Sequence, residues 1–176
     1  HECSSAASDV YKRQVLNCAE IAAHPRVTCL IAGTNDLAKD MQIRLASDRQ
    51  STREGMLYAL SKMVTAARAH HISVLDGVFN DINDLDGLGQ ECGHGIALGF
   101  DGKTLIHPQQ IETANRLFAP TSEEIGEAEN IIAAFQSPEN AGKGVIKVNG
   151  KMTELLHLQQ AKRIVAIAAA IQEIES

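Results

Sequence analysis

The pattern of apolar and polar positions predicts strands and helices that alternate along most of the chain. The unbroken apolar run within 27–33 predicts a strand buried on both faces, because it lacks the polar alternation of a half-exposed strand. Residues 52–69 predict an amphipathic helix, since apolar residues recur there at three- and four-residue spacing. These residues are Leu57, Leu60, Val64 and Ala67. Further strands are predicted at 72–79 and 103–107, and further helices at 15–23, 85–98 and 109–118. Successive strand–helix units indicate an α/β fold with a parallel sheet.

The pattern changes after residue 120. Residues 121–135 predict a helix that has Thr121 or Ser122 as its N-cap. The apolar residues of 144–152 surround an Asn149-Gly150 pair, which is a turn signal and predicts a hairpin. A last amphipathic helix is predicted over 155–174, with Leu158, Ala161, Val165 and Ala168 on one face. We therefore expect a partial (β/α) barrel over 15–120 and a helix–hairpin–helix extension over 121–176.

Composition narrows the possible classes of function. The chain has 176 residues, of which 44% are hydrophobic and 22% charged, a typical globular composition. Its net charge of -6 gives no basic surface for nucleic acid. It contains no apolar stretch of the roughly 18 to 20 residues that a membrane span needs. The 4 cysteines form no CxxC pair or disulfide framework, and we expect a cytoplasmic protein.

The amino-terminal segment differs from the rest. The sequence starts at His1, and residues 4–14 show no clear helical or strand period. They resemble translated adapter sequence at the ends of metagenomic reading frames. We expect residues 1–14 to be non-native or disordered, genuine sequence to begin near Val15, and an upstream portion to be lost.

Each predicted strand delivers a polar side chain at its carboxyl end, where parallel α/β folds place their chemistry. These side chains are Asp36, Asp76 and His107. Each also has a structural explanation: Asp36 as a helix N-cap, Asp76 as a cap of the turn before Gly77, and His107 as a loop hydrogen-bonding residue. Lys103 is interpreted as a solvated surface charge.

The segment 33–36 has the chemistry of a small-ligand site. Mg²⁺ prefers oxygen ligands and is held by one or two carboxylates together with water and substrate, so Asp36 is a candidate ligand. Gly33 allows the backbone to approach a ligand closely. The N–H groups around Thr34 and Asn35, at the start of a predicted helix, are suited to a substrate carboxylate.

Several longer motifs resemble the citrate lyase β-subunit-like proteins of the HpcH/HpaI aldolase superfamily. They occur in the same order over roughly 15–171. The motifs are GTNDLAKD at 33–40, LDGVFND at 75–81, GFDGKTLIHPQQIETAN at 99–115, FAPTSEEI at 118–125 and GKMTELLHLQQAKRIVAIAAAI at 150–171.

The resemblance implies a TIM (β/α)₈ barrel and a Mg²⁺-dependent lyase. Such enzymes cleave or form a C–C bond between an acyl-CoA, of the citryl-, malyl- or citramalyl-CoA type, and a small 2-oxo acid. Asp36 then matches the second metal ligand of the family, and residues 33–35 match its substrate-carboxylate loop. Thr34-Asn35 stands where Ala-Glu is more common, which leaves the substrate open.

The resemblance also implies roles for three residues outside that segment. Glu154 stands where many relatives carry an Asp that transfers a proton, from a tail that reaches a neighbouring subunit. A homo-oligomer is therefore expected. His107 matches the signature of the last strand and is expected at the CoA mouth, and we add Asp76 to the candidate substrate-binding residues.

The chain departs from the family pattern upstream of these motifs. The first metal ligand, a Glu, falls in register near Val10, where no Glu is present, and the catalytic Arg has no counterpart. We therefore expect the chain to be inactive by itself. Two alternatives remain: an aldolase that acts on free 2-oxo acids, and a non-catalytic partial barrel that assembles with a partner chain.

Overall fold

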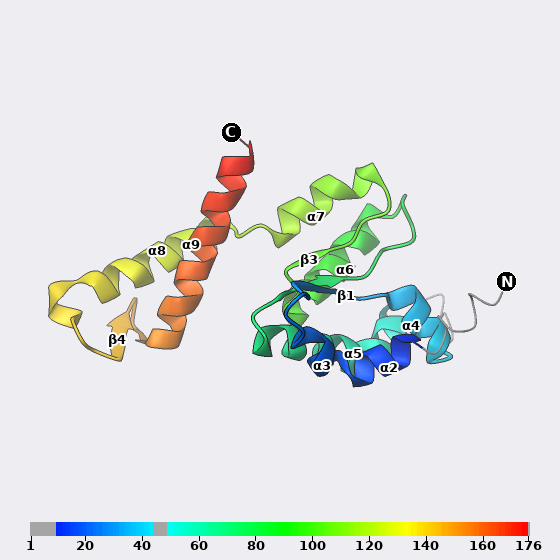
Figure 1. The fold of residues 1–176 in the computed structure, drawn as a ribbon. Coiled ribbons are helices and arrows are strands. Elements are labelled where there is room, and N and C mark those ends of the chain that lie inside the picture. The colour runs from blue at the N-terminus through cyan, green and yellow to red at the C-terminus, as the bar shows by residue number, and fades with distance from the viewer. Residues whose placement is uncertain (1–9, 44–48, 176) are drawn as a thin grey trace. The chain divides into compact units, whose positions relative to one another are not determined.

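The computed structural model describes residues 10–43 and 49–175, and Figure 1 shows their path. The chain divides into two compact units, one ending at Phe118 and the other beginning at Ala119. Residues 1–9 of the predicted non-native segment lie outside the described residues, whereas residues 10–14 belong to helix α2. The nature of that segment stays a prediction.

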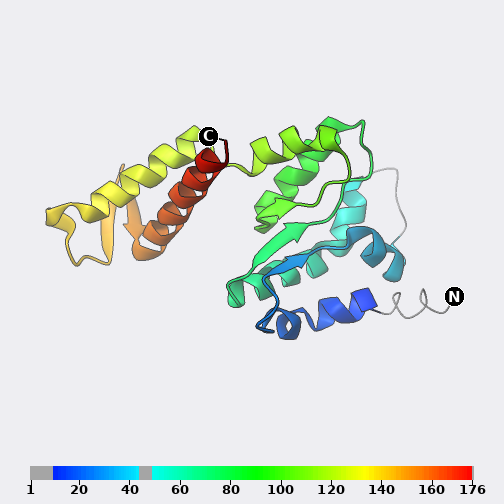
Figure 2. The same ribbon diagram turned by 45° about the horizontal axis from the view of Figure 1, so that its top comes forward.

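A three-stranded parallel sheet forms the centre of the first unit, in the order β1-β2-β3. The strands are β1 (Cys29–Ile31), β2 (Ser73–Asp76) and β3 (Gly102–Lys103). Helices α5 (Arg49–Ala69) and α6 (Leu85–Leu98) connect successive strands, so the predicted α/β class and parallel pairing are confirmed. Figure 2 shows β1 and β2 side by side. The remaining helical segments of this unit are α2 (Val10–Leu16), α3 (Cys18–Ala22), α4 (Thr34–Asp40), the 3₁₀ helix Pro108–Gln110 and α7 (Ile111–Phe118).

Helix α5 supplies much of the main core, but its buried face differs slightly from the predicted one. Leu60, Val64 and Ala67 are buried as predicted, whereas Leu57 is 42% exposed. The inward positions next to it are Met56 and Ala59. At this end of α5 the buried face therefore lies about one residue away from the predicted one. The prediction followed the leucines, because Ala and Met are weaker indicators of a buried position than Leu.

The prediction that β1 is buried on both faces was wrong. Leu30 is buried in the main core cluster together with Leu60, whereas Ile31 is 58% exposed. Cys29 is half-buried, and burial raises the pKa of its thiol. Successive side chains of a strand point to opposite faces, and among the described residues the core covers the Leu30 face and leaves Ile31 exposed.

Strand β3 is shorter than the predicted strand 103–107. After Lys103, the N–H of Thr104 still bonds to the Asp76 carbonyl, but the N–H of Ile106 donates to the Gln110 side chain at 3.1 Å. Pro108 then begins the 3₁₀ helix. The strand ends here because the N–H of Ile106 donates to a nearby side chain and not to a neighbouring strand.

The second unit pairs two helices with a hairpin. Helix α8 (Ser122–Gln136) begins with a capping box, in which Thr121 and Glu124 bond to each other's backbone N–H. This hydrogen bond from Thr121 lowers the pKa of Glu124. The 3₁₀ helix Pro138–Asn140, strands β4 (Val145–Val148) and β5 (Lys151–Glu154), and helix α9 (Leu155–Glu175) follow.

The hairpin and the small core beside it explain how this unit folds. Strands β4 and β5 pair antiparallel, and both turn residues have positive φ, 48° at Asn149 and 83° at Gly150. These angles are typical of a type I′ turn. Ala128, Ile146 and Ala161 are buried, so the two helices and the hairpin share apolar contacts. Among the described residues, no helix is long and apolar enough to span a membrane.

Candidate functional site

The turn that follows β1, residues Gly33 to Asp36, is here called the metal-candidate turn. Gly33 is the N-cap of α4 and offers no side chain to cap it. Thr34 is buried, whereas Asn35 and Asp36 are exposed. The turn therefore presents a carboxylate to solvent at the carboxyl end of a parallel strand, as the sequence predicted.

The loop that follows β2, residues Gly77 to Asn80, contacts this turn at two points and is here called the support loop. Asn35 Nδ2 donates to Asn80 Oδ1 at 2.9 Å, and Asn80 Nδ2 donates back to Asn35 Oδ1 at 2.8 Å. Gly77 packs against Thr34, since a Cβ added there would clash with Thr34 Oγ1 and lie 2.7 Å from the Ala32 carbonyl oxygen. The two strand ends are thus joined by side chains and by close backbone approach.

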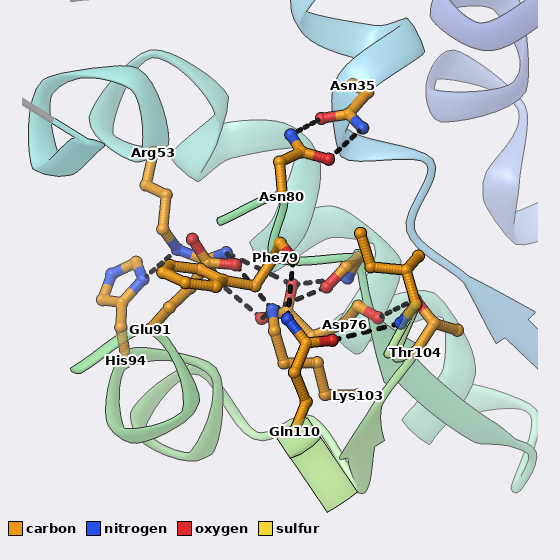
Figure 3. A network of polar contacts seen from close by, with 12 residues as sticks. Asn35, Arg53, Asp76, Phe79, Asn80, Glu91, His94, Lys103, Thr104 and Gln110 are labelled. Atoms are coloured by element: carbon orange, nitrogen blue, oxygen red, sulfur yellow. Dashed lines mark hydrogen bonds and ion pairs between the residues drawn. The ribbon is translucent and has the colours of Figure 1, made fainter. Parts of the chain in front are cut away.

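A buried network of two cations and two carboxylates lies next to the support loop, as Figure 3 shows. We call Arg53, Asp76, Glu91 and Lys103 the ion-pair network. Arg53 Nη1 and Nη2 donate to the two Asp76 oxygens at 3.4 and 3.1 Å, and Arg53 Nη1 lies 3.3 Å from Glu91 Oε1. These residues come from α5, β2, α6 and β3, so the network joins the sheet to both of its crossover helices.

Lys103 has a fully buried side chain, as does Asp76 in the same network. Its Nζ donates to Glu91 Oε1 at 2.5 Å, to the Gly77 carbonyl at 2.6 Å and to Asp76 Oδ2 at 3.3 Å. The Lys103 side chain is 0% exposed. The interpretation of Lys103 as a solvated charge was therefore wrong, because its three donors are all satisfied inside the protein.

His94 lies at the edge of the ion-pair network. Arg53 Nε donates to His94 Nδ1 at 2.8 Å, which requires that nitrogen to be unprotonated. Burial, and then the positive charge of Arg53, lower the pKa of His94 below its usual value. The geometry and the electrostatics both favour the neutral imidazole.

Asp76 has surroundings that differ from those expected of a substrate-binding carboxylate. Its side chain is 0% exposed and contacts both Arg53 and Lys103. Asp76 Oδ1 also accepts a hydrogen bond from Gly77 N at 2.8 Å, which agrees with the alternative of a turn cap. The substrate-binding role of Asp76 stays a prediction, and this geometry favours a role in holding the support loop.

The sequence reasoning missed Arg53 and Glu91, although a signal for each was present. Arg53 lies three residues before Met56, on the buried face of α5. Glu91 lies three residues after the fully buried Leu88 on α6. A charged residue at a core position of an amphipathic helix requires an opposite charge, and that requirement would have identified the network.

His107 and Glu154 are the two remaining candidates. His107 is the N-cap of the 3₁₀ helix, and its Nδ1 accepts from Gln109 N at 3.2 Å. Its role as a loop hydrogen-bonding residue is thus present, and Nε2 has no bond within the described part of the chain. Glu154 ends β5 in the second unit, and its carboxylate is exposed. Their functional roles stay predictions.

The described side chains allow a simple test of the metal site. No group of three or more His, Cys, Asp or Glu side chains within the described ranges is arranged to hold a metal ion. Asp36 supplies one exposed carboxylate, whose oxygens could coordinate a metal ion. This arrangement fits Mg²⁺, which commonly binds one or two carboxylates and keeps several waters, and it does not fit a metal that needs an all-protein cage.

Comparison with protein families identifies the chain. Residues 12–108 match the model of the HpcH/HpaI aldolase/citrate lyase family. This chain belongs to that family. The matched range contains the metal-candidate turn, the support loop and all four residues of the ion-pair network, so the family core and the candidate site coincide.

Individual proteins are also similar to the chain. The (3S)-malyl-CoA thioesterase of Cereibacter sphaeroides is 50% identical over 157 residues, which are 89% of this chain and 54% of that protein. The citrate lyase subunit beta of Leuconostoc mesenteroides is 38% identical, over 92% of this chain and 53% of that protein. The chain thus spans about half the length of these relatives.

A solved structure has a similar fold. The protein CitE from Mycobacterium tuberculosis, in complex with magnesium, acetoacetate and coenzyme A, matches with a TM-score of 0.73 and 27% identity. The match covers 90% of this chain and 58% of that one. The α/β arrangement of the chain is therefore also found in that protein.

Proposed function

We propose that the chain contributes to a Mg²⁺-dependent lyase that cleaves or forms a C–C bond between an acyl-CoA and a small 2-oxo acid. The observation that carries this proposal is the family match over residues 12–108, which includes an exposed carboxylate at the end of β1. The similar protein CitE has been solved with magnesium, acetoacetate and coenzyme A. We also propose that the first unit is part of a (β/α)₈ barrel in a cytoplasmic homo-oligomer.

Asp36 is the residue that would hold the metal ion. Its exposure leaves room for the water and substrate oxygens that complete an octahedral shell. When bound there, Mg²⁺ supplies Lewis-acid polarisation of the oxygen of the oxo-acid part. Gly33, Thr34 and Asn35 would bind the substrate carboxylate, since they form the same turn as Asp36.

Two further residues are assigned to the CoA side and to proton transfer. His107, at the end of the segment that follows β3, would contact the CoA thioester near its entrance. In the cleavage of malyl-CoA, the carboxylate of Glu154 from a neighbouring subunit would accept the hydroxyl proton while the bond between the hydroxyl carbon and the methylene breaks, which gives glyoxylate and the acetyl-CoA enolate. The exposed Glu154 would deliver the proton that converts this enolate to acetyl-CoA.

Hydrolysis of the thioester is a second candidate reaction, and one observation favours it. The identity to the malyl-CoA thioesterase, 50%, exceeds the 38% identity to the citrate lyase subunit. Both reactions use a CoA thioester of a small hydroxy acid, but hydrolysis breaks the C–S bond and gives malate and free CoA. The products therefore distinguish the two candidates.

A chimera tests the proposal. The segment of the Cereibacter sphaeroides protein that matches this chain over 157 residues is exchanged for that of the chain. The chimera is incubated with malyl-CoA and Mg²⁺, and glyoxylate, acetyl-CoA, malate and free CoA are quantified. We expect Mg²⁺-dependent formation of glyoxylate and acetyl-CoA, and loss of this activity in the Asp36→Asn chimera.

The controls separate the candidates from each other. Malate and free CoA without glyoxylate would support the thioesterase, and turnover of free hydroxy-oxo acids would support the aldolase. A folded chimera that is inactive on all of these substrates would contradict the proposed function. The purified chain alone is assayed in parallel, and we expect no turnover by it.

A further inference from the structure

The metal-candidate turn lacks the usual means of fixing the start of a helix. Helix α4 has only 7 residues, and its N-cap Gly33 makes no side-chain capping bond. An N-cap side chain normally satisfies one of the free N–H groups of the first turn and fixes its direction. The position of Asp36 therefore depends on contacts from outside the helix.

The support loop provides those contacts. The Asn35–Asn80 amide pair makes two hydrogen bonds, at 2.9 and 2.8 Å, between residues 45 positions apart in the sequence. Asn35 is the residue directly before Asp36, so the pair holds the backbone next to the candidate metal ligand. Gly77 presses against Thr34 on the same turn, where no Cβ could be accommodated without displacement.

The support loop is itself held from the opposite side. Lys103 Nζ donates to the Gly77 carbonyl at 2.6 Å, and Gln110 Nε2 donates to the Phe79 carbonyl at 2.9 Å. The Lys103 side chain and the residue Gln110 are each 0% exposed. Figure 3 shows Lys103 and Gln110 reaching the loop, with the Asn35–Asn80 pair at its other end. Asn80 is thus the end of a chain of contacts that starts in the buried part of the unit.

We propose that Asn80 is a positioning residue, which sets the direction of the Asp36 carboxylate through its amide pair with Asn35. This inference rests on the proposed function, because it takes Asp36 as the Mg²⁺ ligand. Partners that orient a metal ligand commonly change metal affinity by about 10- to 100-fold when they are removed. The Asn35–Asn80 pair is exposed to water, so we expect the lower end, about tenfold.

The experiment uses the ¹⁵N-labelled chimera described above, whose remaining residues come from the Cereibacter sphaeroides protein, and Mg²⁺ as the only ligand. Four variants are compared with the wild type: Asn80→Ala, Asn35→Ala, the double variant and Asp36→Asn. Backbone order parameters of residues 33–37 are measured without metal, and Mg²⁺ affinity is measured from the chemical-shift changes of the same residues. Asn83→Ala is the matched control, since Asn83 is an exposed asparagine three residues after Asn80 and lies outside the support loop.

We expect lower order parameters in the turn and about tenfold weaker Mg²⁺ binding in Asn80→Ala, with no change in Asn83→Ala. Asn35→Ala and the double variant should show the same loss, because both substitutions remove one shared interaction. A merely structural role would lower the thermal midpoint and leave the order parameters and Mg²⁺ affinity of the folded chimera unchanged. That result would overturn the inference.

The Asp36→Asn variant distinguishes failure of this inference from failure of the proposed function. If Asp36→Asn loses Mg²⁺ binding but Asn80→Ala keeps normal affinity and normal order in the turn, only the positioning role is wrong. If the wild type does not bind Mg²⁺, or if Asp36→Asn binds it as tightly as the wild type, Asp36 is not the metal ligand. The metal assignment is then wrong, and the inference that depends on it is wrong as well.

Discussion

Two groups of polar side chains lie near the carboxyl ends of β1, β2 and β3, and they differ in how far their hydrogen bonds are satisfied. In the ion-pair network, Lys103 and Asp76 are 0% exposed, and two cations face two carboxylates. In the metal-candidate turn, Asp36 is exposed, and its neighbour Asn35 is held by a neutral amide. The first group has little capacity left for a ligand, whereas the second presents a carboxylate to one.

The difference shows that charge alone does not identify a ligand site. A buried charge must be paired. Removing one partner of such a pair costs more free energy of unfolding than the intact pair contributes, because the other charge is left buried without compensation. The ion-pair network therefore contributes to the fold by fixing α5, α6 and the support loop in one arrangement. In the metal-candidate turn, Thr34 is buried against the support loop, but Asp36 is exposed and can present its carboxylate.

Removing the Lys103 charge is expected to have the largest effect on stability. The Lys103→Met variant leaves Asp76 and Glu91 buried with Arg53 as their only cation within the network. We expect the free energy of unfolding to fall by about 3–5 kcal/mol, measured by urea denaturation. Lys39→Met, at an exposed lysine of α4, is the control and should change it by less than about 0.5 kcal/mol. Equal effects of the two variants would contradict a structural role for the network.

The contact between the support loop and the metal-candidate turn can be tested with one methyl group. Gly77→Ala would bring a Cβ into Thr34 and the Ala32 carbonyl oxygen, and backbone must shift to accommodate it. We expect a loss of about 1–3 kcal/mol in the free energy of unfolding, with chemical-shift changes in residues 33–36.

Gly93 provides the matched control for Gly77→Ala. It lies within α6, and a Cβ added there meets nothing within 4 Å. Gly93→Ala should therefore increase the free energy of unfolding by about 0.5–1 kcal/mol, since alanine is the better helix former. A destabilised Gly93→Ala variant, or a Gly77→Ala variant as stable as the wild type, would contradict the packing described for these two glycines.

The pH dependence of stability tests the edge of the ion-pair network at His94. The pKa of His94 is lowered in the folded protein, so the unfolded chain binds more protons over the range between that lowered value and about 6.5. Stability is therefore fully present above about pH 6.5 and falls as the pH drops through this range. Protonation of Nδ1 would also break the bond from Arg53 Nε.

The His94→Gln variant is the measurement for this prediction. The side chains that face His94, which are Arg53, Asp76 and Glu91, remain in place in it. We expect urea midpoints of the wild type to fall more steeply between pH 7 and pH 5 than those of His94→Gln, with a total effect smaller than that of Gly77→Ala. His70→Gln, at an exposed histidine, is the control and should keep the wild-type slope. Parallel slopes in all three proteins would contradict the prediction.

The elements of the fold could be predicted because their signals are local. The apolar run at 29–31, the Asn149-Gly150 turn and the cap at Thr121 each depend on neighbouring residues. The sequence could not show how far a local signal extends. The predicted strand at 103–107 ends at Lys103, because a side chain from Gln110 takes a backbone donor that a strand would use.

The candidate site could be predicted only where family motifs and strand ends coincide. The place of Asp36 followed from the end of β1, but the ion-pair network joins residues from four separate elements. Such pairing depends on tertiary packing, and no short spacing in the sequence encodes it. Lys103 shows this most clearly, because a lysine after a glycine has the local pattern of a surface residue and yet is fully buried.

The same substitution, aspartate to asparagine, is expected to have very different effects in the two groups, and the smallest effect is expected in the exposed group. Asp36→Asn should leave the free energy of unfolding within about 0.5 kcal/mol of the wild type, because Asp36 is exposed and belongs to no described ion pair. Asp76→Asn removes a charge that faces both Arg53 and Lys103, and it should lower the same quantity by about 3 kcal/mol or more. Urea denaturation of both variants, with Mg²⁺ titration of Asp36→Asn, measures the contrast. A destabilised Asp36→Asn variant would mean that the Asp36 carboxylate stabilises the fold. It would then contradict the view that this carboxylate is available to bind a ligand.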